Sequence, residues 1–206
     1  MEPEQKERIL FKARDLFLQF GIRSVSMDDI AGSLGVSKKT IYQYFSDKDE
    51  LVMGVMQQKM YDSQAICMRD QQVAENAIDE QLRAMEAIDE HLGAMNPAVL
   101  FDLKKYHPLA FQMLEKHKND FMMGILLQNL RRGISEGLYR PTLNVDVIAK
   151  YRIESVLLTF EPAFYSKHKL SMADMERILL DHFLFGIATI AGHELILKYQ
   201  QQRQKT

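Results

Sequence analysis

The 206-residue chain is poor in residues that cross-link or interrupt a fold. It has one cysteine, Cys67, so it can form neither a disulfide within the chain nor a cysteine-based metal site. It has five prolines, ten glycines and no tryptophan. No stretch alternates apolar and polar residues long enough to predict a sheet, and no run approaches the roughly 18 apolar residues that span a membrane. These absences favour an all-helical protein that does not cross a membrane.

A targeting signal is also missing from the first residues. Met-Glu-Pro-Glu-Gln-Lys carries acidic charge and has no apolar core, which is unlike a signal peptide. The single cysteine fits a reducing compartment. We therefore expect a cytoplasmic protein.

Positive charge is scarce. The formal net charge is −2, and the first fifty residues hold eight Lys or Arg against nine Asp or Glu. A chain with this balance is not expected to bind nucleic acid indiscriminately. Any contact with DNA must come from a local cluster of cations.

Motifs for catalysis and metal binding are absent. None of the six histidines lies four residues from another, as the ligands of a metalloprotease helix do. The chain has no glycine-rich phosphate loop and no nucleophile elbow. The adjacent pairs Asp181-His182 and His193-Glu194 are typical of a solvated surface. We expect that the protein is not an enzyme and that it binds no metal and no cofactor.

Helical periodicity fills the chain instead. Apolar residues recur on one face over 4–20, and Gly21 follows where a helix-ending glycine is expected. A second helix begins after Ser26, which forms a capping-box pattern with Asp29. It ends at Gly35.

The remaining helices follow similar signals. A third helix begins at Ser37 and runs to about Phe45, and Ser46 is expected to cap the fourth. Gly137 is expected to end a helix and Pro162 to interrupt one. Later helices are predicted at 47–68, 73–94, 97–105, 108–136, 144–166 and 171–203.

Residues 26–45 have the pattern of a helix-turn-helix. The apolar side of the first helix can pack on the second, and Gly35 permits the sharp turn between them. Ile41 and Phe45 would anchor the second helix from beneath. The side chains left facing outward at the start of the second helix are Ser37, Lys38, Lys39, Thr40, Tyr42 and Gln43.

This outward face has the chemistry of a recognition helix. Lysines can pair with phosphates or guanine edges, and a glutamine such as Gln43 can hydrogen-bond to adenine. Helix N-termini attract phosphate, so the helices that start at Ser26, Ser37 and Ser46 could each hold one. Lys48 adds charge nearby, and we expect the acidic residues to lie elsewhere.

The stretch Ile9–Leu51 resembles the DNA-binding domain of the TetR family. The residues that carry the resemblance are Ala13, Phe17, Gly21, Ser26, Asp29-Ile30-Ala31, Gly35-Val36-Ser37, Thr40-Ile41-Tyr42-Gln43-Tyr44-Phe45 and Lys48-Asp49-Glu50-Leu51. Gly32 departs from the usual family pattern and weakens its helix without altering the motif. The matched stretch covers about a quarter of the chain.

The resemblance implies an all-helical homodimer that represses genes from a double-stranded DNA operator. Its helix-turn-helix domain would occupy residues 1–47, and a helical ligand-binding and dimerisation domain would occupy 48–206. It implies DNA contacts by Lys38, Thr40, Tyr42, Tyr44 and Lys48, with Lys39 and Gln43 as base-reading candidates.

The region after residue 50 suggests a ligand pocket. Methionine is flexible and polarisable and suits adaptable apolar sites, although a single methionine is more often an ordinary core residue. We expect an apolar or amphipathic small-molecule effector between the helices. The candidate pocket residues are Met56, Met60, Phe101, Met113, Phe121, Met122, Tyr151 and Phe160.

Two C-terminal segments suggest dimerisation. The helices around 145–164 and 178–197 are apolar on more than one face, so each needs a second partner. Two such helices from each chain would form a symmetric four-helix interface, and burial within a single chain is the alternative. The candidate interface residues are Val156, Phe160, Phe183, Gly186, Ile187 and Ile190.

Two other functions remain open at this point. One is a transcriptional activator or ligand-independent DNA-binding protein, which a C-terminal region without a cavity would favour. The other is a helical enzyme with a vestigial helix-turn-helix, which would need polar chemistry in a cleft.

Overall fold

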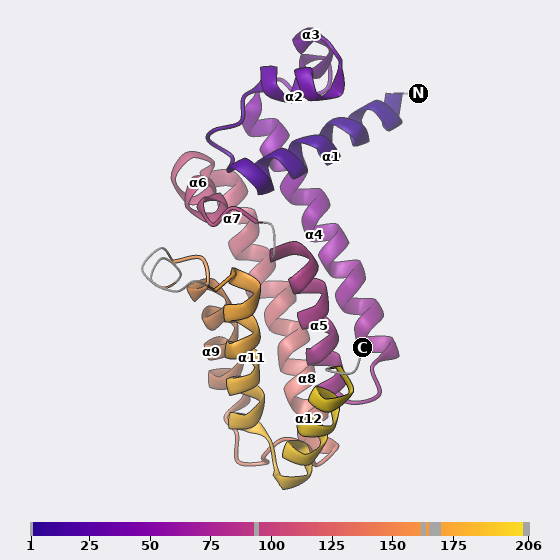
Figure 1. Cartoon of the computed structure of the whole chain (residues 1–206), viewed down its shortest axis with the longest axis vertical. Coiled ribbons are helices and arrows are strands. Elements are labelled where there is room, and N and C mark those ends of the chain that lie inside the picture. Colours follow the sequence, from indigo (N-terminus) through magenta and orange to yellow (C-terminus); the bar gives the residue numbers. More distant parts are fainter. Residues whose placement is uncertain (1, 93–94, 162–163, 165–169, 204–206) are drawn as a thin grey trace. The chain divides into compact units, whose positions relative to one another are not determined.

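The computed structural model describes residues 2–92, 95–161, 164 and 170–203, and most of them are helical. The extended pairing found among these residues is a single bridge between Tyr139 and Ala188. The expected all-α fold is confirmed. Figure 1 shows the elements, which are α1 (Glu2–Phe20), α2 (Met27–Leu34), α3 (Lys38–Tyr42), α4 (Lys48–Val73), α5 (Ala77–Leu92), α6 (Ala98–Tyr106), α7 (Pro108–His117), the π-helical turn η1 (Lys118–Met122), α8 (Met123–Ser135), α9 (Val145–Leu158), α11 (Met172–Ile187) and α12 (Ile190–Arg203).

The chain forms two compact units. The first, here the head unit, consists of Met1–Ser63 and Ala94–His117, and the second, here the body unit, consists of Gln64–Gly93 and Lys118–Thr206. Helix α4 passes from one unit into the other. Helices α6 and α7 belong to the head unit although α5, which precedes them, belongs to the body unit. The boundary expected after residue 47 falls inside the head unit.

The head unit buries the apolar faces that the periodicity predicted. Ile9, Ala13 and Phe17 of α1 pack with residues of α2, α3 and the first half of α4. Val99 and Leu103 of α6 join the same core. Side chains of this kind each contribute roughly 1.5–3 kcal/mol when fully buried, so α6 is part of what stabilises the helices around it.

The body unit packs α5, α8, α9 and α11 against one another, with α12 on α5 and α11. Gly192 of α12 allows the chain's own backbone to approach closely, because a Cβ atom there would lie 2.2 Å from the carbonyl oxygen of Leu138. The small residue at this position therefore serves packing within the chain.

Several predicted helices are interrupted or end early. The run 108–136 contains a π-helical turn, which adds one residue to a turn and rotates the helical faces that follow. The run 171–203 breaks at Ala188, since Thr189 donates its backbone N–H to the carbonyl of Leu138 at 2.9 Å instead of continuing α11. The predicted helix over 144–166 ends at Leu158. Pro162 lies outside the described residues.

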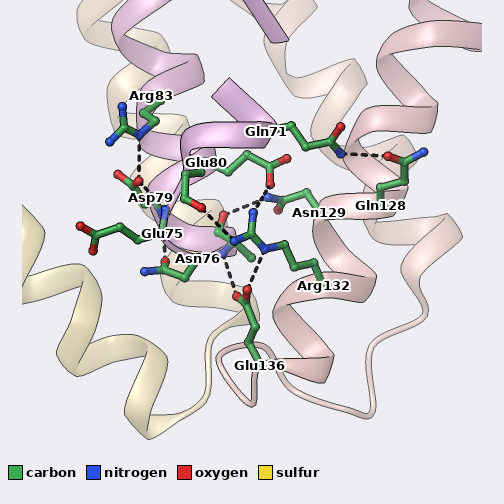
Figure 2. A network of polar contacts seen from close by, with 12 residues as sticks. Gln71, Glu75, Asn76, Asp79, Glu80, Arg83, Gln128, Asn129, Arg132 and Glu136 are labelled. Carbon is green, nitrogen blue, oxygen red and sulfur yellow. Dashed lines mark hydrogen bonds and ion pairs between the residues drawn. The ribbon is translucent and has the colours of Figure 1, made fainter. Parts of the chain in front are cut away.

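A polar network fixes the turn between α4 and α5 in the body unit (Figure 2). The side chain of Asn76 accepts the N–H groups of Ile78 and Asp79, which is why α5 begins at Ala77 and not at residue 73. Arg132 of α8 donates to the carbonyl of Ala74 at 3.0 Å and pairs with Glu80 and Glu136. These contacts tie the end of α4 to α8.

Candidate nucleic-acid interface

The helix-turn-helix forms as the sequence predicts. The Ser26 hydroxyl accepts the N–H of Asp29 at 3.1 Å, and the Asp29 carboxylate accepts the N–H of Ser26 at 2.8 Å, which is a complete capping box. Gly35 ends α2 with a φ of 66°, a left-handed conformation that favours glycine. The Ser37 hydroxyl caps α3 by accepting the N–H of Thr40 at 3.1 Å.

Helix α3 is held from beneath by two apolar anchors. Ile41 and Phe45 are both buried in the head-unit core. The α-helix ends at Tyr42 rather than at Phe45, although the N–H of Phe45 still reaches the carbonyl of Ile41 at 3.0 Å. The predicted outward face is present: Ser37, Lys38, Lys39, Tyr42 and Gln43 are exposed, and Thr40 and Tyr44 are half-buried.

The acidic residues do not all lie away from this face, contrary to expectation. The ammonium of Lys38 lies 2.7 Å from the carboxylate of Asp28 on α2. This hydrogen bond raises the pKa of Lys38. The position of Asp28 was not predicted, because spacing along one helix does not tell which residue of the neighbouring helix lies opposite.

The start of α4 also differs from the prediction. Asp47, not Ser46, caps the helix by accepting the N–H of Glu50 at 2.8 Å. The Glu50 carboxylate accepts the N–H of Ser46, which lowers the pKa of Glu50. Carboxylates thus accept two N–H groups at the start of this helix, those of Ser46 and Glu50.

Lys48 points into the loop between α1 and α2. Its ammonium donates to the carbonyl of Ile22 at 2.6 Å, with the carbonyl of Arg23 at 3.5 Å. Partial burial lowers the pKa of Lys48, and the nearby acids Asp102 and Asp49 oppose that shift. A contact between Lys48 and DNA stays a prediction.

Helix α6 and the residues just before it make contacts that sequence reasoning missed. The N–H of Asn96 donates to the carbonyl of Leu18 at the end of α1, at 2.6 Å. The buried carboxylate of Asp102 accepts the N–H of Arg23 at 2.9 Å. The only signal in the sequence was an acid, Asp102, placed between the apolar neighbours Phe101 and Leu103.

The residue that follows α6 contacts the start of α4. The Nδ1 atom of His107, a buried side chain, lies 2.5 Å from the carboxylate of Asp49 in the first turn of α4. The segment 96–107 therefore touches the end of α1, the following loop and the start of α4.

The candidate pocket residues are divided between the two units. Met56, Met60, Phe101 and Met113 lie in the head unit, and Phe121, Met122, Tyr151 and Phe160 lie in the body unit. Met56 is buried in the head-unit core, whereas Phe101 and Tyr151 are about half exposed. Their role in ligand binding stays a prediction.

The candidate dimer residues differ in how far their side chains are exposed. Phe183 and Ile187 are each 3% exposed and pack inside the body-unit core, so they are not available to a second chain. Ile190 is 82% exposed and Gly186 is exposed. Val156 and Phe160 are half-buried.

The described residues hold no group of three or more His, Cys, Asp or Glu side chains that could bind a metal ion. Among the helices of the same residues, none has the length and apolar character required to cross a membrane.

Comparisons with known proteins agree with this geometry. Residues 9–55 match the profile of bacterial regulatory proteins of the tetR family. The chain is 28% identical over 183 residues to the HTH-type transcriptional regulator YvaF of Bacillus subtilis, covering 88% of this chain and 94% of that protein. It is 24% identical over 154 residues to the HTH-type transcriptional repressor KstR2 of Mycolicibacterium smegmatis, covering 71% and 73%.

The fold itself is shared with solved structures. A TetR transcriptional regulator from Legionella pneumophila aligns with a TM-score of 0.70 at 18% identity, covering 86% of this chain and 95% of that one. The helix-turn-helix, its capping residues and its outward polar face lie inside the matched segment 9–55. The chain thus resembles TetR-type transcriptional regulators in its helix-turn-helix segment and shares their fold.

Proposed function

We propose that the protein is a homodimeric repressor that binds a near-palindromic DNA operator through α3 and responds to a small-molecule effector. The observation that carries the proposal is the exposed polar face of α3, set on the buried anchors Ile41 and Phe45. We propose that it acts in the cytoplasm, on chromosomal DNA.

On the DNA, each residue has a defined role. Ser26 and Ser37 begin the two helices whose N-termini would approach phosphates. Lys38, Thr40, Tyr42 and Tyr44 would position the helix on the backbone. Lys39 and Gln43 would contact base edges in the major groove. Because phosphate contacts are not sequence-specific, operator choice would depend mainly on Lys39 and Gln43.

The size of one recognition helix and the exposed apolar side chains of the body unit support a dimer. One copy of α3 is too short to read a long site, whereas two copies about 34–36 Å apart would read successive major grooves. The body unit leaves large apolar side chains exposed on α9, α11 and α12, which an interface between copies would cover. They are Val147, Tyr151, Leu158, Ile178, Ile190 and Leu197.

The effector would act through α4, which is continuous between the two units. A ligand that binds the body unit better in one position of α4 would shift the population of that position. A coupling of roughly 1–3 kcal/mol would change operator affinity about 5- to 150-fold. The repressor KstR2 of M. smegmatis supports repression as the sign of regulation.

Selection from a random duplex pool, followed by a fluorescence-anisotropy titration, tests the proposal. We expect the selected sequence to be a near-palindrome bound tightly by two chains, with a scrambled duplex bound at least 1,000-fold more weakly. In a transcription assay the protein should reduce output from a promoter that contains this site. Equal, weak binding to both duplexes would contradict the proposal, and increased output would contradict repression.

A further inference from the structure

One peptide group in the head unit is held from both sides. It joins Ile22 to Arg23 in the loop between α1 and α2. Its N–H donates to the carboxylate of Asp102 on α6 at 2.9 Å, and its carbonyl accepts from the ammonium of Lys48 on α4 at 2.6 Å. A negative group at the N–H and a positive group at the oxygen both match the dipole of the peptide.

The carboxylate in this arrangement is not a surface group. Asp102 is 5% exposed, in the middle of α6. Burial of a carboxylate is costly unless it is hydrogen-bonded and paired with a cation. Here the backbone N–H supplies the hydrogen bond, and Lys48 is the cation with which it interacts electrostatically. The fold retains a buried charge at the point where α6 meets the loop.

The loop controls where the helix-turn-helix begins. Only three residues separate Arg23 from Met27, the first residue of α2. Ser26, the N-cap of α2, is the last of them. A shift in the position of the Ile22–Arg23 peptide would therefore move the start of α2 and, through the Gly35 turn, α3.

We propose that Asp102 and Lys48 are positioning residues for operator binding, which clamp the Ile22–Arg23 peptide so that α2 and α3 meet DNA in the correct orientation. This inference rests on the proposed function. It assigns α6 a direct role in the affinity of the head unit. It also gives Lys48 a role on the protein's own backbone, in place of the phosphate contact that the resemblance implies.

The first test is the operator affinity of Asp102→Asn, measured at several salt concentrations. Asparagine keeps an oxygen that can accept the Arg23 N–H but removes the charge opposite Lys48. We expect binding about ten-fold weaker, equal to about 1.4 kcal/mol, with an unchanged salt slope because no phosphate contact is lost. Wild-type affinity in this variant would overturn the proposal.

Asp79→Asn is the matched control. Asp79 is 6% exposed in the body unit, accepts the backbone N–H of Glu75 at 3.0 Å and pairs with Arg83 at 2.8 Å. Its replacement removes a buried charge of the same kind, in the unit that does not contain the loop between α1 and α2. We expect operator affinity to stay within about two-fold of wild type. An equal loss of affinity in both variants at equal thermal stability would show a general structural effect and overturn the proposal.

Lys48→Met separates positioning from phosphate contact. We expect weaker binding with an unchanged salt slope, and less than additive losses in the double variant with Asp102→Asn. A slope lowered by about 0.9 would show that Lys48 neutralises a phosphate and would overturn its assignment here.

Hydrogen exchange makes the clamp testable even without an operator. In the free protein, Asp102→Ala should raise the exchange rate of the Arg23 amide at least about ten-fold, while the body-unit amides stay protected. Unchanged exchange at residues 22–26 would overturn the clamp. If wild-type protein selects no DNA, the proposed function fails, whereas the exchange result still decides whether Asp102 holds the loop.

Discussion

The ammonium of Lys38 lies 2.7 Å from the carboxylate of Asp28, so the first cation of the recognition helix is already paired within the free protein. Both side chains are largely exposed, so water and salt screen the pair and it holds Lys38 only weakly. A DNA phosphate can therefore compete for Lys38. Operator binding would exchange a carboxylate partner for a phosphate partner.

Removal of this cation should weaken binding in a salt-dependent way. Lys38→Ala is expected to lower operator affinity and to reduce the salt slope by about 0.9, as expected for one lost phosphate contact. Anisotropy titrations at several salt concentrations measure both quantities. Lys150→Ala is the control, since Lys150 is an exposed lysine in the body unit that pairs with Glu154 at 2.8 Å. An unchanged slope in Lys38→Ala would show that Lys38 does not contact a phosphate.

Removal of the competing acid should have the opposite effect. Asp28→Asn frees Lys38 and removes a negative charge near the DNA, so we expect operator binding to be about three-fold tighter at low salt. The gain should shrink as salt rises, because both charges are exposed. Asp62→Asn, which removes a carboxylate of α4 that pairs with Arg14 of α1, is expected to leave affinity unchanged. Weaker binding by Asp28→Asn would mean that Asp28 helps to hold α3.

A buried carboxylate in the body unit predicts a pH-dependent stability. Glu176 is fully buried and pairs with Arg152, and its Oε2 atom has no hydrogen-bond partner. Burial raises the pKa of Glu176 above its usual 4.5, although Arg152 opposes the shift. An acid whose pKa is higher in the folded state stabilises the fold below its unfolded pKa, and this stabilisation is lost as the pH rises through the folded pKa.

Urea unfolding of wild type and Glu176→Gln measures this contribution. Glutamine does not titrate, so the difference in unfolding free energy between the two proteins isolates Glu176. We expect the advantage of wild type to shrink as the pH rises from about 4.5 towards neutrality. An advantage that grows with pH would show that the Arg152 pair outweighs burial.

The dimer proposal predicts a specific sensitivity at Ile190. Ile190→Glu places a carboxylate at a side chain that is 82% exposed in one chain, and a symmetric interface would contain it twice. We expect sedimentation at micromolar concentration to show a dimer for wild type and a monomer for this variant, since an unpaired charge is costly to bury. Leu109→Glu, at a 65% exposed leucine of the head unit, should remain a dimer. A wild-type monomer would contradict the dimer itself.

Local signals in the sequence predicted the helix-turn-helix well. The Ser26–Asp29 capping box, the Gly35 turn and the Ile41 and Phe45 anchors depend on residues close together in the chain, and each is present. The contacts that set the charge of the site were not predictable in this way. Asp28 meets Lys38 from another helix, and Asp102 meets Arg23 across 79 positions. Such pairings depend on how helices pack, which periodicity does not encode.

The C-terminal predictions were limited for the same reason. Apolar residues on several faces of 178–197 indicated a second partner, but part of that need is met within the chain by α5 and by the backbone at Leu138. Phe183 and Ile187 therefore lie in the core, while Ile190 follows the break at Ala188 and is exposed.

The most direct test of the account is the ratio of affinities for the selected operator and a scrambled duplex, measured for wild type and for the double variant Lys39→Ala/Gln43→Ala. These two side chains are exposed on and directly after α3, so their replacement should not unfold the head unit. We predict that the ratio falls from at least about 1,000 towards 10 or less, since each base-reading pair contributes roughly 1–3 kcal/mol of discrimination. Binding to the scrambled duplex should change far less. An unchanged ratio would show that α3 does not read the operator and would contradict the account.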